Sequence, residues 1–186
     1  MARPIEFNKE VVLSNAMKVF WMKGYESTSM ADLIEATGLT SRSMYNVFGS
    51  KHGLFNAALD KYYEGVVPAL VKLQEGKGLQ AIREYVETVT MVEPLNGCFY
   101  VNTLSEKNSV EDDCVQKVQL HFEKLELAFE SKLDYAIKKE KFTGDPKLRA
   151  KQLVSMLQGL AVYSKMKFSL KDQQEMARDF LSLIGI

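Results

Sequence analysis

Apolar residues recur at helical spacing along nearly the whole chain, and no stretch alternates in the manner of a β-strand. In the first such segment Leu13, Ala16, Met17 and Phe20 share one face, spaced i, i+3, i+4 and i+7. Gly24 follows, in the position where glycine commonly ends a helix. The pattern predicts an all-α chain of about nine helices. After the first, we expect them near residues 30–37, 41–47, 51–73, 79–92, 98–107, 111–140, 146–168 and 171–184.

Two short helices near the N-terminus form a candidate helix-turn-helix. They are joined at Gly38-Leu39-Thr40, and the second runs from the polar Ser41-Arg42-Ser43 to the apolar Met44, Val47 and Phe48. In such a motif the second helix enters the major groove with its first residues at the base edges, while its apolar residues dock it on the protein. An ordinary hairpin of packed helices has the same spacing, so the spacing alone leaves both interpretations open.

The polar residues of this region have chemistry that suits DNA. Arg42 can donate two hydrogen bonds to a guanine, worth roughly 1–3 kcal/mol of discrimination between bases. Tyr45 and Asn46 can reach phosphate oxygens, which position a helix without reading sequence. Ser29 and Lys51 stand at predicted helix starts, where backbone N–H groups attract phosphate.

A longer run of residues carries a resemblance to a known family. The run contains a phenylalanine, Gly-Tyr and Thr-Ser pairs, a turn glycine, a tyrosine three residues before a phenylalanine, and a lysine that opens the fourth helix. Over residues 8–60 this spacing resembles the DNA-binding domain of TetR-family regulators. The residues are Phe20, Gly24, Tyr25, Thr28, Ser29, Gly38, Tyr45, Phe48 and Lys51. The C-terminal part resembles the family more loosely, at Asn96-Gly97-Cys98 and Leu157-Gln158-Gly159-Leu160.

The resemblance implies a homodimeric transcriptional regulator, usually a repressor, which binds double-stranded operator DNA and is released by a small-molecule effector. It implies a helix-turn-helix domain over residues 1–50, a connecting helix over 51–74, and a ligand-binding and dimerisation domain over 75–186. Ser43 stands where many relatives have Gly or Pro, so the operator sequence does not follow. The DNA contacts that it implies are Arg3, Thr28, Ser29, Thr40, Ser41, Arg42, Ser43, Tyr45, Asn46 and Lys51.

The C-terminal part offers candidates for a pocket and for a dimer interface. The helices expected to enclose a pocket mix aromatic and polar residues as ligand sites do, although helical cores show the same mix. The candidate pocket residues are Tyr85, Thr88, Phe99, Asn102, Thr103, His121, Phe122 and Leu125. Apolar stripes on the last two helices predict a dimer interface rather than a core within one chain. They are formed by Met156, Leu157, Leu160, Phe180, Leu181 and Ile184.

The two cysteines carry separate hypotheses. Cys98 follows Gly97 at a predicted helix start, where the dipole favours a reactive thiolate. A sensor of electrophiles or oxidants is therefore an alternative to a small buried core residue. Cys114 lies beside three acidic residues that disfavour a thiolate, and we expect it at the surface or half-buried. No second cysteine pair and no nearby histidine completes four ligands, so we expect no metal site.

The composition is that of a globular chain. Of 186 residues 46% are apolar and 26% charged, and the formal charge is zero, so any DNA affinity must come from a local patch. No apolar run reaches the roughly 18 residues of a membrane span and no signal peptide opens the chain, so we expect a cytoplasmic location. No Gly-rich phosphate loop, nucleophile with a matching base, or Glu-x-x-His triplet points to an enzyme or a cofactor. A helical ligand-binding module without DNA binding remains the other alternative.

Overall fold

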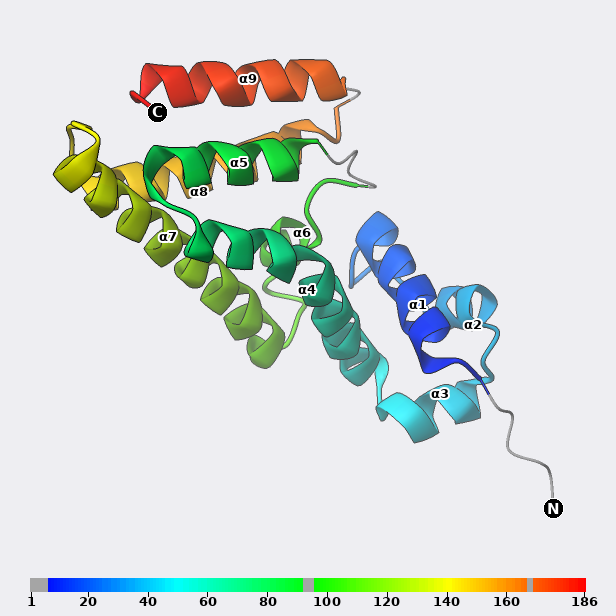
Figure 1. The fold of residues 1–186 in the computed structure, drawn as a ribbon. Coiled ribbons are helices and arrows are strands. Elements are labelled where there is room, and N and C mark those ends of the chain that lie inside the picture. The colour runs from blue at the N-terminus through cyan, green and yellow to red at the C-terminus, as the bar shows by residue number, and fades with distance from the viewer. Residues whose placement is uncertain (1–6, 92–95, 167–168) are drawn as a thin grey trace.

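The computed structural model describes residues 7–91, 96–166 and 169–186 (Figure 1). Within these ranges the chain forms nine α-helices and no strand, which confirms the expected all-α fold. No helix of the described ranges combines the length and the apolar character needed to cross a membrane. The helices are α1 (Lys9–Lys23), α2 (Met30–Thr37), α3 (Ser41–Phe48), α4 (Lys51–Glu75), α5 (Gly78–Thr90), α6 (Phe99–Ser105), α7 (Asp112–Lys139), α8 (Pro146–Tyr163) and α9 (Leu170–Leu183).

Side-chain caps set the starts of α2, α3 and α4, the three consecutive helices that form and follow the helix-turn-helix. The Ser29 hydroxyl accepts from the backbone N–H of Asp32, whose carboxylate accepts from the backbone N–H of Ser29, and this capping box begins α2. The Thr40 hydroxyl begins α3 and the Ser50 hydroxyl begins α4 in the same manner. Gly38 ends α2 with a φ of 70°, a left-handed conformation that glycine adopts without steric cost. Local sequence therefore determines where these helices begin and end.

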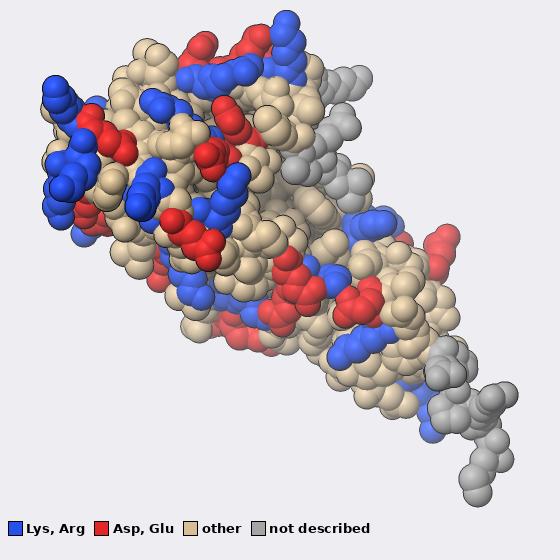
Figure 2. Space-filling model, viewed as in Figure 1, with Lys and Arg blue, Asp and Glu red and all other residues tan. Residues whose placement is uncertain are grey.

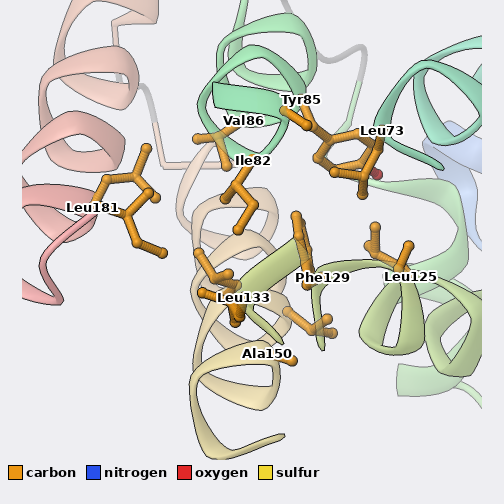
Figure 3. Close-up of a cluster of buried hydrophobic side chains, with 14 of the residues drawn as sticks. Leu73, Ile82, Tyr85, Val86, Leu125, Phe129, Leu133, Ala150 and Leu181 are labelled. Carbon is orange, nitrogen blue, oxygen red and sulfur yellow. The ribbon is translucent and has the colours of Figure 1, made fainter. Parts of the chain in front are cut away.

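Two clusters of buried apolar side chains hold the helices together. The first joins α1, α2 and α3 to the start of α4, to α6 and to the start of α7, around Phe20, Leu54 and Phe55. The second joins α5, α7, α8 and α9 to the end of α4, and Figure 3 shows Ile82 and Phe129 at its centre. In Figure 1 the helices α1 to α3 lie at one end of the molecule, and α5, α8 and α9 lie at the other. Helices α4 and α7 run between the two ends and contribute to both clusters.

Helix α4 is longer than the sequence pattern predicts, since it continues to Glu75. It contains Pro68, which cannot donate a backbone hydrogen bond and crowds the preceding turn. Figure 1 shows α4 changing direction along its length, as expected of a helix with an internal proline. The bend lets one helix pack against the N-terminal cluster with its first half and against the C-terminal cluster with its second half.

Candidate nucleic-acid interface and ligand cavity

Helices α2 and α3 form the helix-turn-helix that the sequence predicts, and α1 and α4 support it. The Asn15 side chain donates to the carbonyl of Ala36 over 3.0 Å, which ties α1 to the end of α2. In the turn Leu39 is buried, and Met44 of α3 is 1% exposed. Val47 is an exception, because 39% of it is exposed. The expectation that Val47 docks the helix is therefore wrong, since it lies on the outer face of α3.

The polar face of α3 points into solvent. Ser41, Arg42, Tyr45 and Asn46 are all exposed, and the Tyr45 ring keeps 51% of its surface. Ser43 is half-buried, and its hydroxyl accepts a hydrogen bond from the Thr40 hydroxyl over 3.0 Å. A surface of arginine, phenol, amide and hydroxyl groups on one short helix offers donors to both base edges and phosphate oxygens.

The flanking positions behave differently from one another. Ser29 is exposed at the start of α2, whereas Thr28 is 1% exposed and its hydroxyl donates to the carbonyl of Gly24 over 2.6 Å. The expected phosphate contact of the Thr28 side chain is wrong, because its one donor is used inside the protein. The Lys51 amine lies 4.5 Å from the centre of the Tyr25 ring, and partial burial lowers its pKa. Arg3 lies outside the described residues.

The turn after α1 is held by residues that sequence reasoning missed. One carboxylate oxygen of Glu106 accepts from the backbone N–H groups of Tyr25 and Glu26, over 2.6 and 3.2 Å. The Ser109 hydroxyl donates to the Glu26 carboxylate over 2.8 Å. These bonds connect the end of α6 and the loop before α7 to the helix-turn-helix. No local pattern marks Glu106, because its partners lie about eighty positions earlier in the chain.

A second connection joins the segment before α6 to the end of α1. The Trp21 indole donates to the carbonyl of Gly97 over 3.1 Å, and the Asn96 amide donates to the carbonyl of Trp21 over 2.9 Å. The Asn102 amide in turn donates to the carbonyl of Asn96 over 2.9 Å. Asn102 thus stabilises this segment and does not line the cavity described next, contrary to the sequence-based expectation.

A cavity of about 430 Å³ lies between the two buried clusters. Helices α1 and α4 to α9 and the segment around Cys98 form its wall, which is mainly apolar. Of the expected pocket residues, Phe99 and Thr103 are absent from this wall, because both are buried in the N-terminal cluster or bonded within α6. The expected residues that do line it are Tyr85, Thr88, His121, Phe122 and Leu125.

The cavity wall carries few polar groups, and His121 is the most unusual. It is 8% exposed, and its Nδ1 atom has no hydrogen-bond partner among the described residues. Burial, with a smaller contribution from Lys124, lowers its pKa to about 4, so the imidazole is neutral near pH 7. A buried polar atom without a partner costs free energy unless a ligand or water satisfies it. The cavity is therefore bounded mainly by apolar surface, with a neutral imidazole in its wall.

Comparisons with known proteins place the chain in a family. The family described as "Bacterial regulatory proteins, tetR family" matches residues 12–58. The uncharacterised HTH-type transcriptional regulator YezE of Bacillus subtilis is 32% identical over 135 residues, which cover 69% of this chain and 70% of YezE. The chain belongs to the TetR family of transcriptional regulators.

Other relatives in the TetR family carry more specific descriptions. The HTH-type transcriptional repressor ComR of Escherichia coli is 37% identical over 107 residues, which cover 54% of this chain and about half, 51%, of ComR. A solved structure of a cysteine mutant of the TetR-family regulator CifR, complexed with 26-bp double-strand operator DNA, superposes with a TM-score of 0.77. It covers 97% of this chain and 98% of CifR at 23% identity, which supports the fold.

In this TetR-family chain the apolar stripes of α8 and α9 are divided between inside and outside. Leu160, Leu181 and Ile184 belong to the core of their own chain, so the expectation that they form a dimer interface is wrong. Met156, Leu157 and Phe180 are half-buried against that core. The apolar stripe predicted from the sequence is the face that packs into the core of the same chain. Core positions and interface positions recur with the same helical period, so the spacing did not distinguish them. The outer faces carry other apolar residues, namely Leu148, Val162, Met176 and Leu183, which are 45–83% exposed.

The two cysteines lie in different surroundings. Cys98 lines the cavity, and the Tyr62 hydroxyl donates to its sulfur over 3.3 Å. Cys114 is fully buried, not half-exposed as expected, and burial together with Asp113 raises the pKa of its thiol to about 12. Its sulfur lies 3.8 Å from Nδ1 of His52. A histidine therefore does lie beside Cys114, although it is sixty-two positions away in the sequence.

Proposed function

We propose that the chain is a homodimeric transcriptional repressor that binds a pseudo-palindromic operator and releases it when a small molecule fills the cavity. The observation that carries this proposal is the exposed polar face of α3, presented by a helix-turn-helix in a member of the TetR family. Two relatives support it, since ComR is named a repressor and CifR was solved with operator DNA. The proposed role is regulatory rather than enzymatic and belongs in the cytoplasm.

The proposal assigns a role to each part of the chain. Residues 1–50 bind DNA, residues 51–74 connect, and residues 75–186 bind the second subunit and supply most of the effector cavity, to which α1 and α4 also contribute. Thr40, Ser41, Arg42 and Ser43 meet the base edges. Ser29, Tyr45, Asn46 and Lys51 meet the phosphates.

Local contacts rather than net charge would supply the DNA affinity. Figure 2 shows Lys and Arg interspersed with Asp and Glu over the visible face, in keeping with a formal charge of zero. Each phosphate that a protein neutralises contributes a slope of about −0.9 to the dependence of log affinity on log salt concentration. We therefore expect a modest number of phosphate contacts and a measurable salt slope.

Fluorescence anisotropy with DNA from upstream of the gene tests the DNA-binding role, with random DNA of equal length as the control. We expect tighter binding to the upstream DNA, and a salt slope that Lys51→Ala lessens by about 1. Lys107→Ala is the matched control, because Lys107 is an exposed lysine in the turn that follows α6, outside the helix-turn-helix. Weak binding that is equal on upstream and random DNA, and that selection from random sequences does not improve, would favour a helical ligand-binding module without DNA binding.

The outer faces of α8 and α9 support the proposed dimer. An exposed apolar patch on a soluble chain commonly marks an interface. Leu148, Val162, Met176 and Leu183 are the exposed apolar side chains that such an interface on these two helices would cover.

Effector sensing through Cys98 is a second candidate, favoured by its position in the cavity wall against the Tyr62 hydroxyl. In that case an electrophile or oxidant that enters the cavity modifies the sulfur. The Cys98→Ser variant would then keep DNA binding and lose its response to peroxide or quinone. A response that is equal in the variant would leave non-covalent ligand binding as the mechanism.

A further inference from the structure

The first turns of α4 and α7 meet at a cluster of metal-ligating side chains. The Nε2 atom of His52 lies 3.2 Å from a carboxylate oxygen of Asp113 and 3.6 Å from one of Glu111. On the other side of the ring, Nδ1 lies 3.8 Å from the Cys114 sulfur. Ligand atoms of His52, Asp113 and Cys114 all lie within 4.8 Å of one another.

The spacing fits a small divalent cation. Zinc binds nitrogen and oxygen at about 2.0–2.2 Å in a tetrahedron, which requires ligand atoms roughly 3.3–3.6 Å apart. The two distances from His52 Nε2 lie close to that spacing. Acidic residues at the start of a helix are commonplace by themselves. What distinguishes this cluster is an imidazole from a different helix, with one nitrogen facing both carboxylates.

Neighbouring groups hold the proposed ligands in place. The Asn56 amide donates to one Asp113 oxygen over 2.8 Å, and the backbone N–H of Cys114 donates to the other over 2.8 Å. The Cys114 sulfur lies against the second ring nitrogen of His52, which favours one orientation of the imidazole. Partners of this kind orient metal ligands and raise metal affinity. The Asp113 and Glu111 side chains are 54% and 64% exposed, so an ion can enter from solvent.

We propose that His52, Glu111 and Asp113 bind a divalent transition-metal ion of the zinc class, with water completing its coordination. The cation replaces the proton at Nε2 and neutralises the two carboxylates. Imidazole and carboxylate ligands are typical of zinc and its neighbours in the first transition series. Cys114 is a positioning residue in this site, because its sulfur contacts the ring nitrogen that faces away from the ion.

The location gives the ion a mechanical role. Helix α4 starts three residues after α3 ends, and His52 is its second residue. A metal ion bound by His52 and by the start of α7 therefore connects α4, the helix that follows recognition helix α3, to α7. A role in changing DNA affinity rests on the proposed function, whereas metal binding itself does not.

Calorimetric titration of the full-length, untagged chain with Zn²⁺ tests the site. We expect one equivalent to bind, and His52→Gln and Asp113→Asn each to weaken binding by about tenfold or more. Asp112→Asn is the matched control, since it removes the same charge from the same helical turn, whereas the ion pairs of His52 among the described residues are with Glu111 and Asp113. We expect its affinity to stay within about threefold of the parent. Thermal melts without metal verify that each variant folds. At one fixed Zn²⁺ concentration the Tm of the parent and of Asp112→Asn should rise by more than the Tm of His52→Gln or Asp113→Asn.

Three results would overturn the site: no binding below about 0.1 mM Zn²⁺, undiminished binding in His52→Gln, or equal weakening by Asp112→Asn, which would indicate diffuse attraction to acidic residues.

A separate anisotropy measurement, on DNA to which the metal-free chain binds, addresses regulation. There, Zn²⁺ should change the affinity of the parent and leave that of His52→Gln unchanged. Equal affinities with and without Zn²⁺ would overturn the regulatory role only, and absence of DNA binding would count against the proposed function and not against the metal site.

Discussion

The Glu106 carboxylate is the most informative position at which to perturb the connection between the helix-turn-helix and the rest of the chain. It accepts from two backbone N–H groups, those of Tyr25 at 2.6 Å and Glu26 at 3.2 Å. Hydrogen bonds to a charged group contribute about 1.5–3 kcal/mol each, and the longer, exposed bond to Glu26 belongs at or below the lower limit. Glu106→Ala should therefore lower the free energy of unfolding by about 2–4 kcal/mol.

Urea unfolding followed by circular dichroism measures this loss, at one protein concentration because a dimer would make stability depend on it. In a chain of this size each kcal/mol shifts the Tm by about 2–4 °C, so the Tm should fall by roughly 5–15 °C. Lys107→Ala, at the next position and exposed, is the control and should change stability by less than about 0.5 kcal/mol. A loss below about 0.5 kcal/mol in Glu106→Ala would refute the argument that this carboxylate holds the turn.

Four further predictions follow from the site. Gly24→Ala should cost more than about 1 kcal/mol in urea unfolding, because φ is +85° and the added Cβ would overlap the Glu106 carboxylate. Arg42→Ala should relax specificity at one base position and cost roughly 1–3 kcal/mol in anisotropy, whereas an equal loss on random DNA would contradict base reading. Because the pKa of His121 is lowered to about 4 from 6.5, the unfolded chain binds more protons between these values. Stability should fall from pH 6.5 towards 4, and less steeply in His121→Gln; identical slopes would contradict the burial argument. Leu183→Asp should shift sedimentation at micromolar concentration towards a monomer, whereas Leu127→Asp on α7 should not, and an unchanged parent-like dimer would move the interface elsewhere.

The helices of the chain could be predicted from sequence to within a few residues. The bounds of α2 and α3 follow from caps, glycines and apolar spacing, and those signals act over fewer than about five residues. The exposed polar start of α3 was predictable for the same reason. Helix α4 continues through Pro68 as expected and ends two residues later than the predicted bound, at Glu75.

The side to which a residue faces was harder to predict. Thr28 and Ser29 are adjacent hydroxyl residues, yet the first is buried and bonded to Gly24 and the second caps α2. On α9, Leu181 is buried and Leu183 is 83% exposed. Helical period shows which residues share a face, but a helix apolar on two faces does not reveal which one its own chain covers.

Sequence alone determined the all-α fold, the helix-turn-helix and the family resemblance, since each depends on patterns within short stretches of chain. Only the tertiary structure decided the groups that meet across long separations. It brought His52 to Asp113 and Cys114, and Glu106 to the turn after α1. It also placed His121 in the cavity wall, where its Nδ1 atom has no partner within residues 7–91, 96–166 and 169–186. Such contacts arise from the packing of whole helices, which adjusts the position of each side chain through many weak interactions, and no local spacing encodes the result.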